Sequence, residues 1–403
     1  MIRSMYSGVS GLQAHGVAID VVADNIANVN TPGFKAARAQ FQALVSQTLR
    51  GASSPTSGGQ NPAQVGLGVT IGGIERQMGQ GSLQTTGRSS DLAIEGNGFF
   101  VLSNNGSARY TRNGAFGVDG SRTLVDSASG AAVMGWASDT AGSIDTSQPP
   151  TRLSLPAAGQ TMARASTRLL LGGNLNAAAN VGDTATTQVR LYDSQGSVQL
   201  VSFTFAKTNI NEWSWTAADG GGAAIGAGTL TFDANGHPTT GAQTLSIPLT
   251  NGAATPMNVS IGFDGVGQLA QASEVVPTMQ DGLPPGDFQG FSVTNNGALI
   301  GSFSNGLTRQ LGQLAMATFS NTAGLERDSG GAFAETANSG VAQVGAAGTG
   351  GRGRVIAGSL EMSNADLTRE FSTLIMLQRG FQANGRSVTT SDQLLQDILS
   401  LKQ

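Results

Sequence analysis

The chain has 403 residues, of which 12% are charged, 5% are aromatic and 58 are glycines. This length suffices for roughly two to four domains, and a glycine content about twice the ordinary usage favours short strands and turns over long solvated helices. The net charge of -4 offers no basic field for nucleic acid or an anionic membrane. The absence of cysteine removes disulfides, thiolate metal sites and thiol nucleophiles, and with only two histidines we expect no metal site and no cofactor.

The sequence predicts neither a membrane span nor a secretory signal. No run approaches the ~18 apolar residues needed to cross a bilayer. The first residues, MIRSMYSGVSGLQAHGV, lack a basic start followed by an unbroken apolar stretch. We therefore expect no membrane insertion and no cleaved signal peptide.

The first thirty residues predict an amphipathic helix. Apolar or small residues recur at steps of three and four, which is a heptad pattern. The pattern stops at the sequence NVNTPG, where Pro32 disfavours helical geometry at Thr31, so we expect a helix over about residues 3–28. The apolar residues expected to form an interface on this helix are Ile2, Met5, Val9, Leu12, Ile19 and Ile26.

The other end of the chain predicts a second helix of the same kind. Ser363, followed three residues later by Asp366, is typical of a helix start. Gly380 and Gly385 disfavour a helix and are better explained by a close neighbour, so we expect a partner helix to pack there. The expected interface residues on this helix are Leu367, Phe371, Leu374, Phe381, Val388, Leu395 and Leu399.

Between these helices the sequence favours β-structure. Short runs typical of strands, such as 99–102, 108–111, 189–192, 198–205 and 314–319, alternate with Asn-Gly and Asp-Gly turns at 105–106, 113–114 and 119–120. Proline pairs at 149–150 and 284–285 mark the edges of a middle block, which indicates an outer domain inserted into an inner one. We expect terminal coiled-coil helices at 1–30 and 360–403, a connector at 31–70, an inner β-domain at 71–145 and 285–359, and an outer β-domain at 146–284.

The predicted fold class is thus multi-domain and mainly β, with paired N- and C-terminal helices and nested β-domains. The two helices have mainly each other to pack against, and a two-helix pair leaves part of its apolar surface exposed. We infer that neighbouring copies cover the remainder, so that the chain assembles with itself. The alternative is that both are core helices of one globular domain.

The sequence contains no recognisable active site, and we expect no enzyme. His15 lies beside the heptad stripe and His237 lies in a turn. Trp213 and Trp215 alternate with their neighbours as strand core residues do, although a carbohydrate-stacking site is the alternative for this region.

Both ends of the chain resemble the bacterial flagellar rod and hook proteins. The segments SGVSGL at 7–12 and ADNIANVNTPGFK at 23–35 are similar to the amino-terminal signature of that family. The segment 361–401, with LQRGFQAN at 377–384, is similar to its carboxyl-terminal signature. GNGFFVL at 96–102, YTRNG at 110–114 and VMGW at 133–136 resemble its inner β-domain, and LYDSQG at 191–196 resembles the outer domain of its hook members.

This resemblance implies a structural subunit of the flagellar hook, a curved hollow tube that joins rod to filament and transmits motor torque as a universal joint. It implies a helical homopolymer outside the cell, exported by the type III apparatus, that contacts rod, hook cap and hook-filament junction proteins. The alternatives are a distal rod subunit of the basal body and, in another class, a secreted β-rich carbohydrate-binding protein or hydrolase. The family signature places the helix exit and the connector to the inner β-domain at Asn25, Asn28, Thr31, Gly33 and Phe34.

Overall fold

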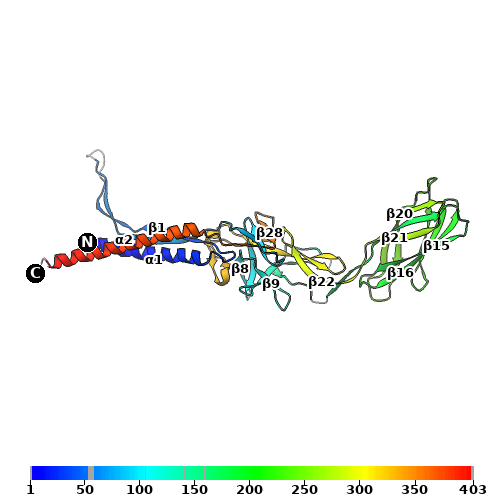
Figure 1. The fold of residues 1–403 in the computed structure, drawn as a ribbon, viewed down its shortest axis with the longest axis horizontal. Helices are drawn as coiled ribbons and strands as arrows, with labels where there is room; N and C mark the ends of the chain where they lie inside the picture. Colours follow the sequence, from blue (N-terminus) through cyan, green and yellow to red (C-terminus); the bar gives the residue numbers. More distant parts are fainter. Residues whose placement is uncertain (1, 53–58, 105, 140–141, 158–159, 401–403) are drawn as a thin grey trace. The chain divides into compact units, whose positions relative to one another are not determined.

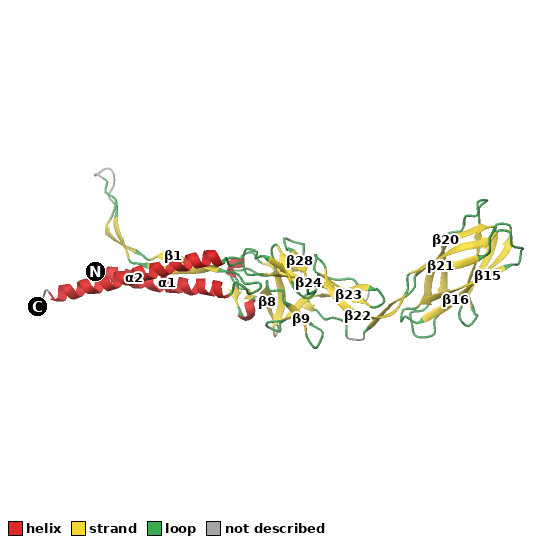
Figure 2. Cartoon of the chain, in the orientation of Figure 1, coloured by secondary structure: helices red, strands yellow, loops and turns green. Residues whose placement is uncertain are grey.

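The computed structural model describes residues 2–52, 59–104, 106–139, 142–157 and 160–400. The chain divides into two compact units (Figure 1). Unit 1 contains residues 1–155, 292–300 and 310–403, and unit 2 contains residues 156–291 and 301–309. Almost all regular structure outside the two terminal helices is strand (Figure 2), so the expectation of a mainly β chain with a helix at each end is confirmed.

The two helices of unit 1 are α1 (Ile2–Ala27) and α2 (Leu367–Ser400), and they lie side by side (Figure 1). α2 begins one turn later than we expected. The carboxylate of Asp366 accepts hydrogen bonds from the backbone N–H groups of Thr368 and Arg369, so Asp366 caps the helix. The prediction of Ser363 as the cap was wrong, because its hydroxyl accepts from Ala365 before the helix starts.

The segment after α1 contains two pairs of antiparallel strands. β1 (Ala37–Ala43) pairs with β4 (Val69–Arg76), and β2 (Ser46–Arg50) pairs with β3 (Ala63–Gly66). Most side chains of these strands are exposed. The expected connector at 31–70 therefore includes ladder hydrogen bonds, while residues 53–58 of that segment lie outside the described residues.

The remaining strands of unit 1 enclose a small core. β7 pairs with β8 and β11, and Phe99, Tyr110, Trp136 and Phe333 pack in one cluster. Two short 3-10 helices, Thr322–Gly324 and Ser329–Gly331, precede the last strands. The strands are β5 (Leu83–Thr85), β6 (Leu92–Glu95), β7 (Phe99–Asn104), β8 (Ser107–Thr111), β9 (Phe116–Val118), β10 (Leu124–Asp126), β11 (Ala132–Ala137), β12 (Thr151–Arg152), β25 (Glu326–Arg327), β26 (Phe333–Ala334), β27 (Gln343–Ala346), β28 (Arg354–Ala357) and β29 (Ser359–Glu361).

Unit 2 is built from two four-stranded sheets around one hydrophobic core. One sheet has the order β19-β20-β14-β21 and the other the order β15-β16-β17-β18. Trp213 and Trp215 are 1% exposed and pack with Phe203, Phe205 and Phe263, which confirms the core interpretation and leaves neither indole a surface on which a sugar could stack. The strands are β13 (Thr161–Arg164), β14 (Arg168–Asn176), β15 (Thr184–Tyr192), β16 (Val198–Asn209), β17 (Glu212–Ala218), β18 (Ala224–Thr231), β19 (Gln243–Ile247), β20 (Met257–Leu269) and β21 (Glu274–Gln280).

Three further strands contain residues of both units: β22 (Leu283–Val293), β23 (Ala298–Phe303) and β24 (Thr308–Thr318). The strand runs that we expected at 99–102, 108–111, 189–192, 198–205 and 314–319 all fall on observed strands, apart from the last residue at 319. β-branched and aromatic residues with period-two burial explain this agreement, as in β16, where buried and partly buried side chains alternate from Val201 to Ala206.

Candidate functional site

α1 and α2 contact each other in one antiparallel register along their shared length. Asn25 hydrogen bonds to Glu370, and Ser4 hydrogen bonds to Ser391 at the other end of α1. Between them, a Cβ on Gly11 would lie 2.6 Å from Asn384, and a Cβ on Gly380 would lie 2.7 Å from the His15 ring. The α1 residues of this seam recur at heptad spacing and are mostly small or polar: Ser4, Gly8, Gly11, His15, Ala18, Val22 and Asn25.

The apolar stripe that we identified on α1 lies one residue beyond this seam. Small residues allow the two helix backbones to approach closely, so the seam falls at Gly8 and Gly11 rather than at the larger Val9 and Leu12. The partner helix expected near Gly380 is α1, while Gly385 has only a Leu12 methyl within 4.0 Å of its Cβ position.

The interface residues expected from the sequence are accordingly only partly covered by their own chain. On α1, Val9 is exposed, Met5, Leu12, Ile19 and Ile26 are half-buried, and the side chain of Ile2 lies outside the described residues. On α2, half-buried Leu374 and Val388 border the seam and Leu395 is half-buried near the end of the helix. Four others are exposed: Leu367, Phe371, Phe381 and Leu399.

Further large apolar residues of both helices are exposed, and the sequence pattern did not single them out. Ile375 is 52% and Met376 is 67% exposed, although both belong to the middle of a regular helix. The sequence feature that could have indicated them is the width of the apolar face. A face broader than a heptad seam indicates contacts with more than one partner helix. The other members of this set are Tyr6, Val17, Leu394 and Ile398.

The predicted helix exit holds α1, β1 and α2 together. The Asn25 side-chain amide donates to Ala37 O at 2.8 Å and to Glu370 Oε2 at 3.2 Å, and its oxygen accepts from Ala37 N at 2.9 Å. Asn28 and Thr31 close the turn after α1, because the Thr31 hydroxyl donates to Asn28 Oδ1. Asn25 is therefore part of the seam, while Asn28 and Thr31 form the turn itself.

Gly33 and Phe34 follow this turn and are buried. Gly33 has a φ of 71°, and a Cβ there would lie 2.4 Å from Asn113 N, so the position requires glycine on both grounds. Its N–H donates to Glu361 O at 2.7 Å. The ring of Phe34 lies under the Arg327 guanidinium, whose carbon is 5.0 Å from the ring centroid.

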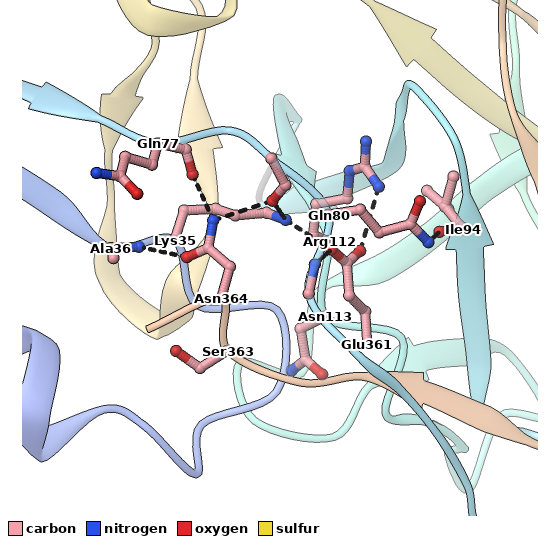
Figure 3. Close-up of polar contacts among 12 residues, drawn as sticks. Lys35, Ala36, Gln77, Gln80, Ile94, Arg112, Asn113, Glu361, Ser363 and Asn364 are labelled. Atoms are coloured by element: carbon pink, nitrogen blue, oxygen red, sulfur yellow. Dashed lines mark hydrogen bonds and ion pairs between the residues drawn. The ribbon is translucent and has the colours of Figure 1, made fainter. Parts of the chain in front are cut away.

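A buried cluster of charged side chains, which no sequence motif predicted, lies next to this turn (Figure 3). The Glu361 carboxylate, on the last residue of β29, accepts from Lys35 Nζ at 2.6 Å, from Gly81 N at 2.9 Å and from the Arg112 guanidinium at 3.1 Å. All three charged side chains are at most 5% exposed. The cluster therefore joins the segment after α1, the residue that follows strand β8 and the end of β29, which precedes α2.

Burial and ion pairing act in opposite directions on the two cations. Burial lowers the pKa of Lys35, and the hydrogen bond and charge of Glu361 oppose that shift. Burial also lowers the pKa of Arg112, and the charge and hydrogen bond of Glu361 oppose that shift. Each cation also donates to a backbone carbonyl, Lys35 to Gly79 and Arg112 to Gly96, so hydrogen bonds support the cluster as well as charge. Arg112 Nε is buried without a hydrogen-bond partner among the described residues.

Asn364 extends this cluster toward α2. Its oxygen accepts from Ala36 N at 2.8 Å, and its amide donates to Gln77 O at 2.7 Å and Gly79 O at 3.0 Å (Figure 3). Lys35 and Glu361 stand inside the family-like segments at the two ends of the chain, but a lone Lys and a lone Glu 326 residues apart carry no spacing signal. The arrangement fastens both helices to the β-core and offers no free acid or base.

Neither a metal centre nor a membrane segment is found in the part of the chain that the structure describes. No three His, Asp or Glu side chains of the described residues gather closely enough to bind a metal ion. None of the helices in the described ranges combines the length and the apolar character that a membrane crossing requires.

Family models match four parts of the chain. Residues 5–35 match the flagella basal body rod protein family, and residues 93–163 match the flagellar hook protein FlgE/F/G D1 domain. Residues 165–283 match the flagellar basal body protein FlaE D2 domain, and residues 356–401 match the flagellar basal body rod FlgEFG protein C-terminal family. The match to the D2 domain covers most of unit 2, and the match to the C-terminal family covers all of α2.

Relatives named flagellar hook protein FlgE match over the whole length. The protein of Borreliella burgdorferi is 39% identical, with 100% of both chains covered, and that of Treponema pallidum is 37% identical with the same coverage. The protein of Escherichia coli K12 is 35% identical over 98% of each chain. The chain belongs to the flagellar hook protein family.

Membership of the flagellar hook protein family decides between the functions that the sequence left open. The match to hook proteins includes unit 2, so it favours a hook subunit over a rod subunit. The flagellar hook proteins are structural proteins of the flagellum, and a secreted hydrolase or carbohydrate-binding protein is not favoured.

Proposed function

We propose that this hook subunit polymerises through its terminal helices, which form a coiled coil lining the inner wall of a hollow, curved tube. The observation that carries this proposal is the uncovered apolar surface of α1 and α2. Phe371 is 50% and Leu399 is 67% exposed in the single chain. Burying such side chains contributes about 1.5–3 kcal/mol each, so neighbouring copies gain stability by covering them.

In this proposal the β-domains are nested and form the outer layers of the tube, with the inner domain at 71–145 and 285–359 and the outer domain at 146–284. The chain is poor in charge and rich in glycine, since 12% of its residues are charged and 58 are glycines. Contacts between such surfaces break and re-form at a small cost in free energy, which suits a tube that bends while it transmits torque as a universal joint.

The proposed setting is the flagellum outside the cell. The family membership supports association with other flagellar components, and we place the chain between rod proteins and hook-filament junction proteins, with assembly under a hook cap protein. Export through the flagellar type III apparatus without a cleaved signal peptide completes the proposal. The proposed contact residues on the helices are those listed above for α1 and α2.

Electron microscopy of purified chain under assembly conditions tests this function. We expect curved tubes from the wild type, and we expect Phe381→Asp to block assembly because it places a charge in an apolar contact. Gln382→Asp is the matched control, because Gln382 is an exposed polar neighbour on the same turn. Unchanged circular dichroism of Phe381→Asp would show that the β-domains remain folded.

Two results would contradict the proposal. Tubes formed by Phe381→Asp at the wild-type concentration would show that the exposed helical surface is not the assembly contact. Straight, stiff polymers from the wild type would instead favour a rod subunit.

A further inference from the structure

α2 extends beyond α1 at the end that carries the carboxyl terminus. The register of the helix pair places Ser4 beside Ser391, so Ile2, the first residue of α1, falls opposite residue 393. Within the described residues, the last turns of α2, residues 394–400, therefore extend past Ile2 of α1 and span about 10 Å. Leu394 is 48%, Ile398 is 50% and Leu399 is 67% exposed on this overhang.

A hollow of about 230 Å³ lies near the opposite end of the same helix pair, between α1, β1 and α2. Six of its eleven lining residues are apolar and three of these are alanines, so it has room for an additional aliphatic side chain. The apolar residues that line it are Ala18, Val22, Ala37, Ala39, Phe41 and Leu377.

Two exposed arginines, Arg38 and Arg369, also line the hollow, together with one carboxylate, that of Glu370. Glu370 is buried and engaged with Asn25, whereas Arg38 is paired only with Glu75 at the surface and Arg369 donates to Gln77. The mouth of the hollow therefore favours an aliphatic side chain accompanied by a carboxylate.

The α2 overhang has this combination of side chains. Leu394 and Ile398 are aliphatic and exposed, and Asp397 is exposed between them in sequence. A chain cannot place its own overhang in its own hollow, because α2 is one continuous helix and 21 residues, or about 32 Å, separate Leu377 from Ile398. The occupant must come from another molecule.

We propose that the α2 overhang of one copy docks into the hollow between α1, β1 and α2 of a second copy, with Ile398 inserted and Asp397 facing Arg38 and Arg369. This inference rests on the proposed self-assembly and names its contact. Because the two surfaces differ, each copy offers one of each, and the contact repeats along an open helical polymer instead of closing a dimer.

Cysteine cross-linking tests this contact directly, since the chain has no cysteine of its own. In polymer of the double variant Ala39→Cys/Ile398→Cys, mild oxidation should give a ladder of covalent dimers, trimers and longer chains on a non-reducing gel. Either single variant should give no ladder, because the contact joins unlike surfaces. Gln40→Cys/Ile398→Cys is the matched control, because Gln40 follows Ala39 on β1 but does not line the hollow; we expect at least about tenfold less cross-linked dimer.

A charge exchange gives an independent readout. Arg369→Asp and Asp397→Arg should each raise the concentration needed for assembly, and the double variant should return it toward the wild-type value. Arg379→Asp is the control, because Arg379 is on α2 but does not line the hollow, so Asp397→Arg should not rescue it. If the wild type polymerises and the double-cysteine variant also assembles but yields no ladder, this contact is wrong and the proposed function still stands. A wild-type chain that forms no polymer would overturn both.

Discussion

At the level of single residues, one hairpin loop of five residues recurs in both units. Asp119, Asp193, Asp219 and Asp233 each begin such a loop, and Oδ1 of each accepts from the backbone N–H four residues later at 2.8–2.9 Å. The fourth position has a left-handed backbone, which suits glycine. Three of the loops have glycine there, at positions 196, 222 and 236, and the remaining one has Arg122 with a φ of 66°.

Arg122→Gly should therefore stabilise the protein. A left-handed conformation costs a residue with a side chain about 1 kcal/mol relative to glycine, so we expect a gain of about 0.5–1 kcal/mol in the free energy of unfolding, measured by urea denaturation. Gly222→Ala is the matched control, since its φ is 85° and its Cβ position is open, and it should lose a similar amount. A lower urea midpoint for Arg122→Gly would show that the contacts of the arginine side chain outweigh the strain.

Asp193 makes the stability of unit 2 depend on pH. Burial acts to raise the pKa of its carboxyl, but hydrogen bonds from Asn251, Gln199 and two backbone N–H groups outweigh burial and lower the pKa. A carboxyl whose pKa is lower in the folded than in the unfolded state binds a proton more tightly in the unfolded state, so acid favours unfolding. Its contribution is therefore present above about pH 4 and is lost as the pH falls through the folded pKa.

Asp193→Asn should remove this dependence. We expect the variant to be about 1–3 kcal/mol less stable at pH 7, because an amide nitrogen cannot accept the hydrogen bonds that the carboxylate accepts. Its thermal midpoint should fall less steeply between pH 5 and pH 3 than that of the wild type. Parallel pH profiles for the two proteins would mean that another group carries the acid sensitivity.

At the level of elements, the sequence predicted both helices and their pairing but not the side on which they touch. Apolar periodicity reports the presence of a helix and the direction of its apolar face, and the helix expected over about residues 3–28 is observed as α1 at Ile2–Ala27. The line of contact depends on which residues let two backbones approach, and here these are Gly8, Gly11 and Gly380. The start of α2 was misjudged by a turn because Ser363 and Asp366 are both good caps. Asn364, between them, is held by tertiary hydrogen bonds to Ala36, Gln77 and Gly79.

The glycines of α1 give a test of this seam. Gly16→Ala has nothing within 4 Å of the new methyl group, so it should stabilise the helix by up to about 1 kcal/mol. Gly11→Ala gains the same helix propensity but places its Cβ 2.6 Å from Asn384, whose amide is held by Gly380 O at 2.8 Å. We expect its unfolding midpoint, followed by helical circular dichroism in urea, to fall below that of Gly16→Ala. Equal midpoints would mean that α1 and α2 separate in solution.

At the level of the whole molecule, the expected strand runs fall on observed strands. The outer domain expected at 146–284 stays a prediction beside unit 2, which contains residues 156–291 and 301–309. The buried cluster of Lys35, Arg112 and Glu361 could not be predicted in the same way. Its members come from three distant parts of the chain, and each has an ordinary surface residue type. Only the fold brings them together, because Gly33, Gly81 and their neighbours allow the backbones to approach.

This cluster determines where the helices can be removed without damage to the β-core. Deleting residues 1–22 and 375–403 together takes away most of the paired helices but keeps Asn25, Lys35, Glu361 and Glu370 with their partners. We expect this truncated chain to be monomeric, to retain its strand signal in circular dichroism and to form no polymer, since the exposed apolar side chains of α2 from residue 375 onward are gone.

A second truncation that removes residues 361–403 is the contrasting case. It leaves Lys35 and Arg112 buried without their shared carboxylate, and an uncompensated buried charge costs about 3–5 kcal/mol. We therefore expect this chain to unfold at a lower temperature than the first truncation, as measured by the loss of strand signal. If the two truncated chains melt together, the cluster does not anchor the helices; if the first one still polymerises, the β-domains rather than the helices drive assembly.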